Sequence, residues 1–276
     1  MENSRGAGNN TVKNMIRKII KYLLPYGFVR VAARANYLKN MGIGVRLWQI
    51  NKIGALCQAL EFSRLNLFED SAIQKLDCVV DVGAHVGLWS MSLLECVKTA
   101  RVIAFEPAPD IFKQLKKRLC GFSNVQVFNI AVGSHKGNVK FNIKNDSGQL
   151  NSILELNAET KDYFTGASDT LTQVDVCMDT LDNLLADQKE ISLLKIDVQG
   201  YEEEVLKGAV SILKKTRFVL IEWSCFVQYE GGVDFTRVHE ILTKECNFQL
   251  YNFDQPMVIK RRAMVCDGLY VNKDFL

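Results

Sequence analysis

From Leu76 to Leu276, short apolar runs alternate with segments whose apolar residues recur at helical spacing. The apolar runs are rich in Val and Ile and have the length of buried strands, about four to eight residues. A helix between two such strands returns the chain so that the second strand can lie parallel to the first. The alternation therefore predicts an α/β fold, a doubly wound, mostly parallel sheet with helices on both faces.

The expected elements follow from the two periodicities. We expect strands at 76–82, 101–106, 125–130, 138–143, 173–177, 191–197 and 218–223, and a C-terminal antiparallel edge of strands at 248–253, 257–260 and 265–271. We expect helices at 88–97, 109–119, 181–185, 202–213 and 235–246. Residues 144–172 are polar and lack periodicity, so they are expected to form a long loop or lid over the substrate.

Charge is distributed unevenly along the chain. Residues 1–60 hold ten Lys or Arg and one acid, a net charge of +9, whereas residues 61–276 hold 24 bases and 30 acids, a net charge of −6. A surface that follows nucleic-acid phosphates needs positive charge on the domain itself, so a nucleic-acid partner is disfavoured. The division predicts a basic helical extension at 1–75 and a separate domain at 76–276.

The extension contains an amphipathic pattern at residues 11–24, with its basic residues outside the apolar stripe. A helix of this kind can lie on an anionic membrane surface, or it can pack on the acidic body, and the pattern fits both. Because Lys21 interrupts the apolar stretch, we do not interpret it as a signal peptide. We expect a cytoplasmic protein, with peripheral contact at the inner face of the membrane as one of the two alternatives. The sequence carries no signal of the oligomeric state.

The eight cysteines are widely spaced, since the closest two, Cys78 and Cys96, are 18 residues apart. This spacing excludes a zinc knuckle and a C-x-x-C dithiol. We interpret the cysteines as small buried side chains in a reducing compartment. No spacing of acidic or His residues supports a metal site, and none is predicted.

The first turn of the predicted sheet reads Asp81-Val82-Gly83-Ala84-His85-Val86-Gly87. Ligands of doubly wound sheets bind beyond the carboxyl ends of the strands, where this turn lies. Gly83 allows a sharp turn, and Gly87 allows the next helix to begin close to a ligand, although both glycines also suit tight packing. Glu106 ends the next strand, where it can accept hydrogen bonds from a ribose diol. Together these features favour a nucleoside cofactor.

Six segments in this order resemble the FkbM family of S-adenosylmethionine-dependent methyltransferases, which have a Rossmann-like fold. They are DVGAHVGLWS (81–90), VIAFEPAPDIFKQLKKRL (102–119), NVQVFNIAVGSHKGNVKF (124–141), Leu181-Asp182, LLKIDVQGYEEEVLKGA (193–209) and FVLIEW (218–223). They span about residues 76–250. The resemblance implies a methyltransferase domain at 76–276 that uses S-adenosyl-L-methionine.

The resemblance also implies roles for single residues in cofactor binding. Asp81, Gly83 and Gly87 would border the methionine end of the cofactor, with Ala84 and His85 in the same turn. Glu106 would hold the ribose hydroxyls, Pro107 would shape the adenine edge, and Ala131 would lie near the adenine. The family generally has Asn where His85 stands and Glu where Gln199 stands. His85 still offers its backbone N–H, whereas Gln199 removes a charge beside the acceptor site.

Two charged residues on one predicted strand are the candidates for catalysis. Lys195 and Asp197 are two residues apart and therefore share one face of the strand. The hypothesis is that Asp197 accepts the proton of an acceptor hydroxyl or orients that hydroxyl, and that Lys195 tunes it by charge. The alternative is a structural Lys–Asp ion pair. Glu222 and His239 are weaker candidates, and Glu202 is expected to lie in a solvated first turn of a helix.

The resulting prediction is an enzyme that methylates a hydroxyl, in which the resemblance alone indicates a sugar of a glycan or glycolipid. A cofactor-binding module without activity is one alternative, since Gln199 replaces an acid. An NAD-dependent oxidoreductase is another, disfavoured because the turn reads G-x-x-x-G and not G-x-G-x-x-G.

Overall fold

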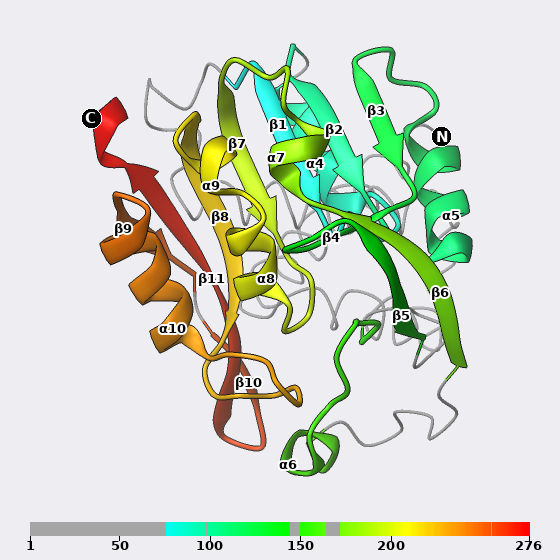
Figure 1. Ribbon diagram of the computed structural model, residues 1–276, viewed down its shortest axis with the longest axis vertical. Coiled ribbons are helices and arrows are strands. Elements are labelled where there is room, and N and C mark those ends of the chain that lie inside the picture. Colours follow the sequence, from blue (N-terminus) through cyan, green and yellow to red (C-terminus); the bar gives the residue numbers. More distant parts are fainter. Residues whose placement is uncertain (1–75, 98, 144–149, 164–171, 255) are drawn as a thin grey trace, which may run out of the picture. The chain divides into compact units, whose positions relative to one another are not determined.

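A computed structural model of the chain describes residues 76–276 except residues 98, 144–149, 164–171 and 255 (Figure 1). The amphipathic helix predicted at 11–24 and the rest of the extension at 1–75 lie outside the described residues. In the part of the chain that is described, no helix has the length and apolar character needed to cross a membrane.

A mixed sheet with a mostly parallel centre forms the core of the fold. Its order is β10–β11–β8–β7–β1–β2–β3, and β9 also pairs with β11. The strands are β1 (Cys78–Val82), β2 (Arg101–Phe105), β3 (Val125–Phe128), β7 (Ile191–Ile196), β8 (Thr216–Ser224), β9 (Phe248–Phe253), β10 (Met257–Ile259) and β11 (Arg262–Asn272). Strands β3, β2, β1, β7 and β8 pair in parallel, and β11 pairs antiparallel with β8, β9 and β10. The predicted α/β sheet and its antiparallel C-terminal edge are both confirmed.

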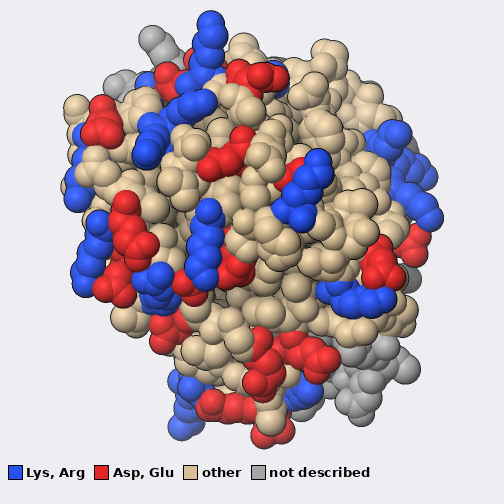
Figure 2. All heavy atoms as spheres, in the orientation of Figure 1, with Lys and Arg blue, Asp and Glu red and all other residues tan. Residues whose placement is uncertain are grey.

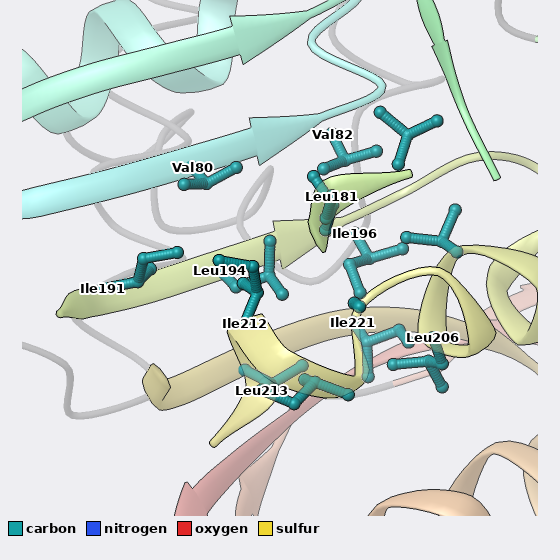
Figure 3. Close-up of a cluster of buried hydrophobic side chains, with 14 of the residues drawn as sticks. Val80, Val82, Leu181, Ile191, Leu194, Ile196, Leu206, Ile212, Leu213 and Ile221 are labelled. Atoms are coloured by element: carbon teal, nitrogen blue, oxygen red, sulfur yellow. The ribbon is translucent and has the colours of Figure 1, made fainter. Parts of the chain in front are cut away.

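Helices cover the two faces of this sheet because side chains of successive strand residues point to opposite faces. One face packs against α4 (Leu88–Cys96) and α5 (Pro109–Leu119), and Val79 and Leu193 are among its buried side chains. The other face packs against four helical segments. They are α7 (Leu181–Leu184), α8 (Glu202–Lys207), α9 (Val210–Leu213) and α10 (Phe235–Glu240). Figure 3 shows Val80, Leu194 and Ile221 of this second cluster beside Ile212 and Leu213 of α9.

A second, three-stranded sheet was not predicted. It has the order β4–β6–β5, formed by β4 (Ala131–Val132), β6 (Thr172–Asp179) and β5 (Gly137–Ile143). The strand predicted at 125–130 ends earlier, because β3 stops at Phe128 and Ala131 begins β4 in the second sheet. Apolar residues of the small sheet pack on Ile111 of α5, so tertiary contacts decide the division.

Other differences are local. The helix predicted at 202–213 is divided near Gly208, where a Cβ atom would lie 2.0 Å from the carbonyl oxygen of Gly133. The helix predicted at 235–246 continues from α10 into a π-helix at Ile241–Glu245, and a 3-10 turn follows β11 at Lys273–Phe275. Within the predicted loop, α6 (Ala158–Lys161) forms because Asn157 caps it by accepting the N–H of Thr160.

Candidate active site

The candidate site lies where the order of the sheet reverses. The chain runs from β1 to β2 on one side, whereas β7 lies on the other side of β1. Ligands of such sheets bind at this point, beyond the carboxyl ends of the strands. Pairing brings polar residues together there, since Asp81 is the register partner of Lys195 and Glu222 is that of Asp267.

The turn after β1 is held by its two glycines. Gly83 has a φ of 78°, and a Cβ atom there would lie 1.8 Å from the carbonyl oxygen of Asp197. Gly87 has a φ of 80°, and its Cβ would lie 2.6 Å from a methyl of Leu115 in α5. Left-handed backbone favours glycine, and at these two positions an added Cβ would also collide with its neighbour. The two glycines thus permit close packing: the turn after β7 packs on Gly83, and α5 packs on Gly87.

Glu106 is buried just after β2 and is held by backbone groups. Its Oε2 accepts the N–H of His85 at 2.9 Å, and its Oε1 accepts the N–H of Ala108 at 2.8 Å. Burial raises the pKa of Glu106 to about 7, although these two hydrogen bonds act against the shift. The backbone N–H of His85 is therefore directed at Glu106, and each carboxyl oxygen keeps a lone pair for a ligand hydroxyl.

An apolar cleft adjoins Glu106 at the ends of β1 and β2. Three of the residues predicted to contact a cofactor, Gly83, Pro107 and Ala131, contribute to its walls. The other lining residues are Val82, Phe105, Ile130, Val132, Phe141, Ile153 and Val198. Ala131 and Val132 of β4 and Phe141 of β5 belong to the small sheet, which therefore supplies one wall of the cleft.

Lys195 connects two acids on the α4 face of the sheet. Its Nζ lies 3.3 Å from Oδ1 of Asp81 and 3.3 Å from Oδ2 of Asp197. Asp81 is fully buried, and its Oδ2 also accepts the hydroxyl of Ser90 at 2.6 Å. Burial alone lowers the pKa of Lys195, but the charges of Asp197 and Asp81 outweigh burial and hold it above its ordinary value. Lys195 therefore stays charged, and the side chain of Asp197, 33% exposed, is the partner that reaches solvent.

Asp81, Asp197, Glu222 and Asp267 form a carboxylate cluster on this face of the sheet. Burial, followed by the charges of Asp197 and Asp267, raises the pKa of Glu222 well above its usual value. Burial and the charge of Asp197 likewise raise the pKa of Asp267 to about 7, although Lys195 opposes the shift. The cluster can therefore store protons near neutral pH.

Gln199 joins two members of the carboxylate cluster. Its Nε2 donates to Oδ1 of Asp197 at 2.9 Å and to Oε2 of Glu222 at 2.7 Å. Its Oε1 accepts the hydroxyl of Tyr229 at 3.0 Å, and its main-chain oxygen accepts the hydroxyl of Ser152 at 2.7 Å. Sequence reasoning identified Gln199 only as a missing acid and did not identify Tyr229 or Asp267 at all. No local motif reveals them, because they come from separate elements.

Glu202 and the weaker catalytic candidate His239 both lie in structural environments. Glu202 was expected in a solvated helical turn, which is wrong, because it is buried and its Oε1 accepts the N–H of Gly200 at 3.1 Å. Burial raises the pKa of Glu202 to about 7, offset in part by hydrogen bonds to backbone N–H groups, Gly200 among them. His239 lies 3.1 Å from the hydroxyl of Tyr270, which belongs to the opposite face of the sheet from the carboxylate cluster.

Residues 150–163, the described part of the predicted lid, form a strap beside the site (Figure 1). Ser152 exchanges backbone hydrogen bonds with Asn142 of β5, and Leu156 forms a β-bridge with Tyr229. Further along, Nζ of Lys260 donates to the carbonyl of Asp162 at 2.7 Å. The strap therefore connects the small sheet, the loop that carries Tyr229 and the β10–β11 hairpin.

On the face seen in Figure 2, basic and acidic side chains are mixed: Lys and Arg are interspersed with Asp and Glu over most of the surface. Among the residues that the structure describes, no group of three or more His, Cys, Asp or Glu side chains is arranged to hold a metal ion.

Comparisons with known proteins address the same region. The sequence profile named Methyltransferase FkbM domain matches residues 81–250, more than half of the chain. The chain is 26% identical over 185 residues to the 2-O-methyltransferase NoeI of Sinorhizobium fredii, covering 62% of this chain and 74% of NoeI. It is 25% identical over 192 residues to the hexuronic acid methyltransferase AglP of Haloferax volcanii, covering 67% and 71%.

The solved structures to which the chain is similar are more distant in sequence. The crystal structure of methyltransferase FkbM from Methylobacillus flagellatus is 17% identical with a TM-score of 0.45, over 77% of this chain and 53% of that one. The chain thus spans about half the length of that protein.

Proposed function

The chain belongs to the FkbM methyltransferase family, and we propose that it methylates a hydroxyl of a sugar in a glycan or glycolipid. The protein is an S-adenosylmethionine-dependent methyltransferase, as the family assignment and the methyltransferase relatives indicate. The sugar is a finer inference, supported by the names of NoeI and AglP at low identity.

The residues beside the apolar cleft fit a nucleoside cofactor. A buried carboxyl group, Glu106, stands at the end of β2 with free lone pairs, and the cleft next to it is apolar enough for a purine ring. We assign Glu106 to the ribose hydroxyls and Pro107 and Ala131 to the adenine. We assign Asp81, Gly83, Ala84, His85 and Gly87 to the methionine end. When bound, S-adenosylmethionine supplies a methyl group on a positively charged sulfur and leaves as S-adenosylhomocysteine.

Asp197 is the proposed proton acceptor, and its exposure carries this assignment. Of the two acids that Lys195 contacts, Asp81 is fully buried, whereas the Asp197 side chain is 33% exposed at the end of β7. Asp197 would accept the proton of the acceptor hydroxyl on a carboxyl oxygen as the methyl group is transferred. Lys195 keeps its charge and balances Asp197. A base of this kind contributes about 10²–10⁴-fold, and orientation of the reactants about 7–11 kcal/mol of the barrier.

Two measurements test the proposal in sequence. Titration calorimetry with S-adenosylhomocysteine and with NAD should give binding of the first only, and the opposite result would exclude a methyltransferase. Methyl-labelled cofactor is then offered with methyl glycosides of neutral hexoses, deoxyhexoses and hexuronic acids. Label on one glycoside class identifies the acceptor. Cofactor binding without label on any glycoside would contradict the sugar assignment and favour the inactive module.

The role of Asp197 is tested by Asp197→Asn, which keeps the shape of the side chain and removes the base. We expect turnover to fall about 10²–10⁴-fold while the affinity for S-adenosylhomocysteine is unchanged. The matched control is Asp110→Asn, because Asp110 has an exposed side chain in α5. If Asp197→Asn retained full turnover, Asp197 would not be the base.

A further inference from the structure

Gln199 has a hydrogen-bonding pattern that only a neutral amide can complete. Its NH₂ group has two donors, and the two carboxylates of Asp197 and Glu222 take both at 2.9 and 2.7 Å. Its oxygen accepts the hydroxyl of Tyr229 at 3.0 Å. The reverse orientation would turn the amide oxygen toward two carboxyl groups, so the neighbours fix which end of the amide faces the acids.

The charges around Gln199 explain why a neutral group is needed. Lys195 on β7 is the cation paired with this cluster, and it already contacts Asp81 and Asp197. The acidic and phenolic groups come from every surrounding element: Asp81 on β1, Asp197 after β7, Glu222 on β8, Asp267 on β11, Glu202 on α8 and Tyr229 after β8. An added carboxylate would increase the repulsion, and a protonated carboxyl has one donor for two acceptors.

We propose that Gln199 is a positioning residue, whose amide holds Asp197 and Glu222 together without adding charge and so keeps Asp197 in one orientation toward the acceptor hydroxyl. This role rests on the proposed function, because it assumes that Asp197 accepts the proton. The side-chain amide also accepts the hydroxyl of Tyr229, and the main-chain oxygen of Gln199 accepts the hydroxyl of Ser152 from the strap, so Gln199 is held from two further sides. Burial and the charges of neighbouring acids raise the pKa of Glu222, which supports the inference that position 199 does not accommodate a further charge.

Two variants separate the charge of Gln199 from its hydrogen bonds. Gln199→Glu keeps the size and adds a carboxyl group, whereas Gln199→Met keeps the length and removes both donors. The matched control is Gln126→Glu, because Gln126 is exposed on the edge strand β3. Each variant is measured for kcat against pH with the glycoside that the panel identifies, for S-adenosylhomocysteine affinity, and for the free energy of unfolding against pH.

We expect Gln199→Glu to move the acid limb of the kcat profile upward by about one pH unit or more. We expect Gln199→Met to lower kcat about tenfold or more without moving KM for the cofactor, because a misplaced group reacts slowly. Gln126→Glu should leave both unchanged. A wild-type profile in Gln199→Glu, or full kcat in Gln199→Met, would overturn the proposal.

The stability measurement separates failure of this inference from failure of the sugar proposal. A carboxyl group at position 199 would have a higher pKa in the folded than in the unfolded chain. The stability of Gln199→Glu relative to the wild type should therefore fall as the pH rises above about 4.3, the ordinary pKa of Glu. If no glycoside is methylated but this fall is seen, the inference about Gln199 stands and the proposed acceptor class is wrong. If instead the stability of Gln199→Glu relative to the wild type does not change with pH, as we expect for Gln126→Glu, the inference about Gln199 is refuted.

Discussion

The glycine turn, residues 83–87 with Glu106, and the carboxylate cluster are neighbours at the carboxyl ends of the strands but are built differently. The glycine turn is nearly contiguous in sequence, and backbone groups hold it, as in the hydrogen bonds from His85 and Ala108 to Glu106. The carboxylate cluster takes its members from four strands or strand ends, and the side chains of Lys195 and Gln199 hold it. A contiguous site can be identified from spacing, whereas a dispersed one depends on strand register.

The two regions also differ in the groups that act on the pKa values of their buried acids. In the glycine turn, Glu106 accepts hydrogen bonds from two backbone N–H groups, which offset the effect of burial only in part, so its pKa is still raised to about 7. In the carboxylate cluster, burial raises the pKa values of Glu222 and Asp267, the charges of neighbouring acids raise them further, and the charge of Lys195 opposes both shifts. Crowding of like charges destabilises a fold, and it persists at sites where proton transfer is needed.

The largest expected effect comes from removing the charge of Lys195. Lys195→Met would leave the fully buried Asp81 without its cation, and we expect a loss of about 3–5 kcal/mol in the free energy of unfolding, measured with urea. Lys207→Met is the control, since Lys207 forms only half-exposed pairs with Glu203 and Glu204 and should lose about 1 kcal/mol or less. Equal losses would mean that the cluster does not depend on its cation.

A somewhat smaller effect is expected in the glycine turn. Gly83→Ala forces a Cβ against the carbonyl of Asp197 in a backbone conformation that alanine avoids, and we expect a loss of about 2–4 kcal/mol with weakened S-adenosylhomocysteine binding. Gly121→Ala is the control, because nothing lies within 4 Å of its added Cβ. Equal urea midpoints for the two variants would show that an added Cβ at position 83 does not collide with the carbonyl oxygen of Asp197.

Glu106 gives a prediction in pH. Because its folded pKa is raised from 4.5 to about 7, its contribution to stability is fully present at low pH and is lost as the pH rises through this range. Glu106→Gln does not titrate, so its stability relative to the wild type should improve by about 3 kcal/mol between pH 4.5 and 7.5. Urea unfolding at several pH values measures the difference, and a flat difference would contradict the raised pKa.

The smallest effect on both regions is expected from deleting residues 1–35. The extension contributes none of the described site residues, so S-adenosylhomocysteine affinity should not change. Binding to anionic vesicles should weaken, since the basic residues of 11–24 contribute about 1 kcal/mol each near such a surface. Replacing Lys13, Arg17, Lys18 and Lys21 by Gln tests the charge alone. If the truncated protein unfolds instead, the helix packs on the body.

Local patterns accounted for most of the main sheet. The runs at β1, β2 and β7 are mainly apolar because both of their faces are buried, and this made them recognisable in the sequence. The small sheet was missed because β4 is two residues long and pairs with β6, about 45 residues later. Gly208 was not recognised as a helix break because the reason for it, the carbonyl of Gly133, is remote in sequence.

The α/β class, the order of the elements, the glycine turn and the acid at the end of β2 were predictable from the sequence, because each depends on residues close together in the chain. It also brought Lys195 and Asp197 to one face, since alternation along a strand is local. Three features could be seen only in the folded chain. Lys195 joins Asp197 to Asp81, and the amide of Gln199 joins Asp197 to Glu222. Glu202 is buried. Those contacts depend on strand order and register, which are set by packing between distant segments.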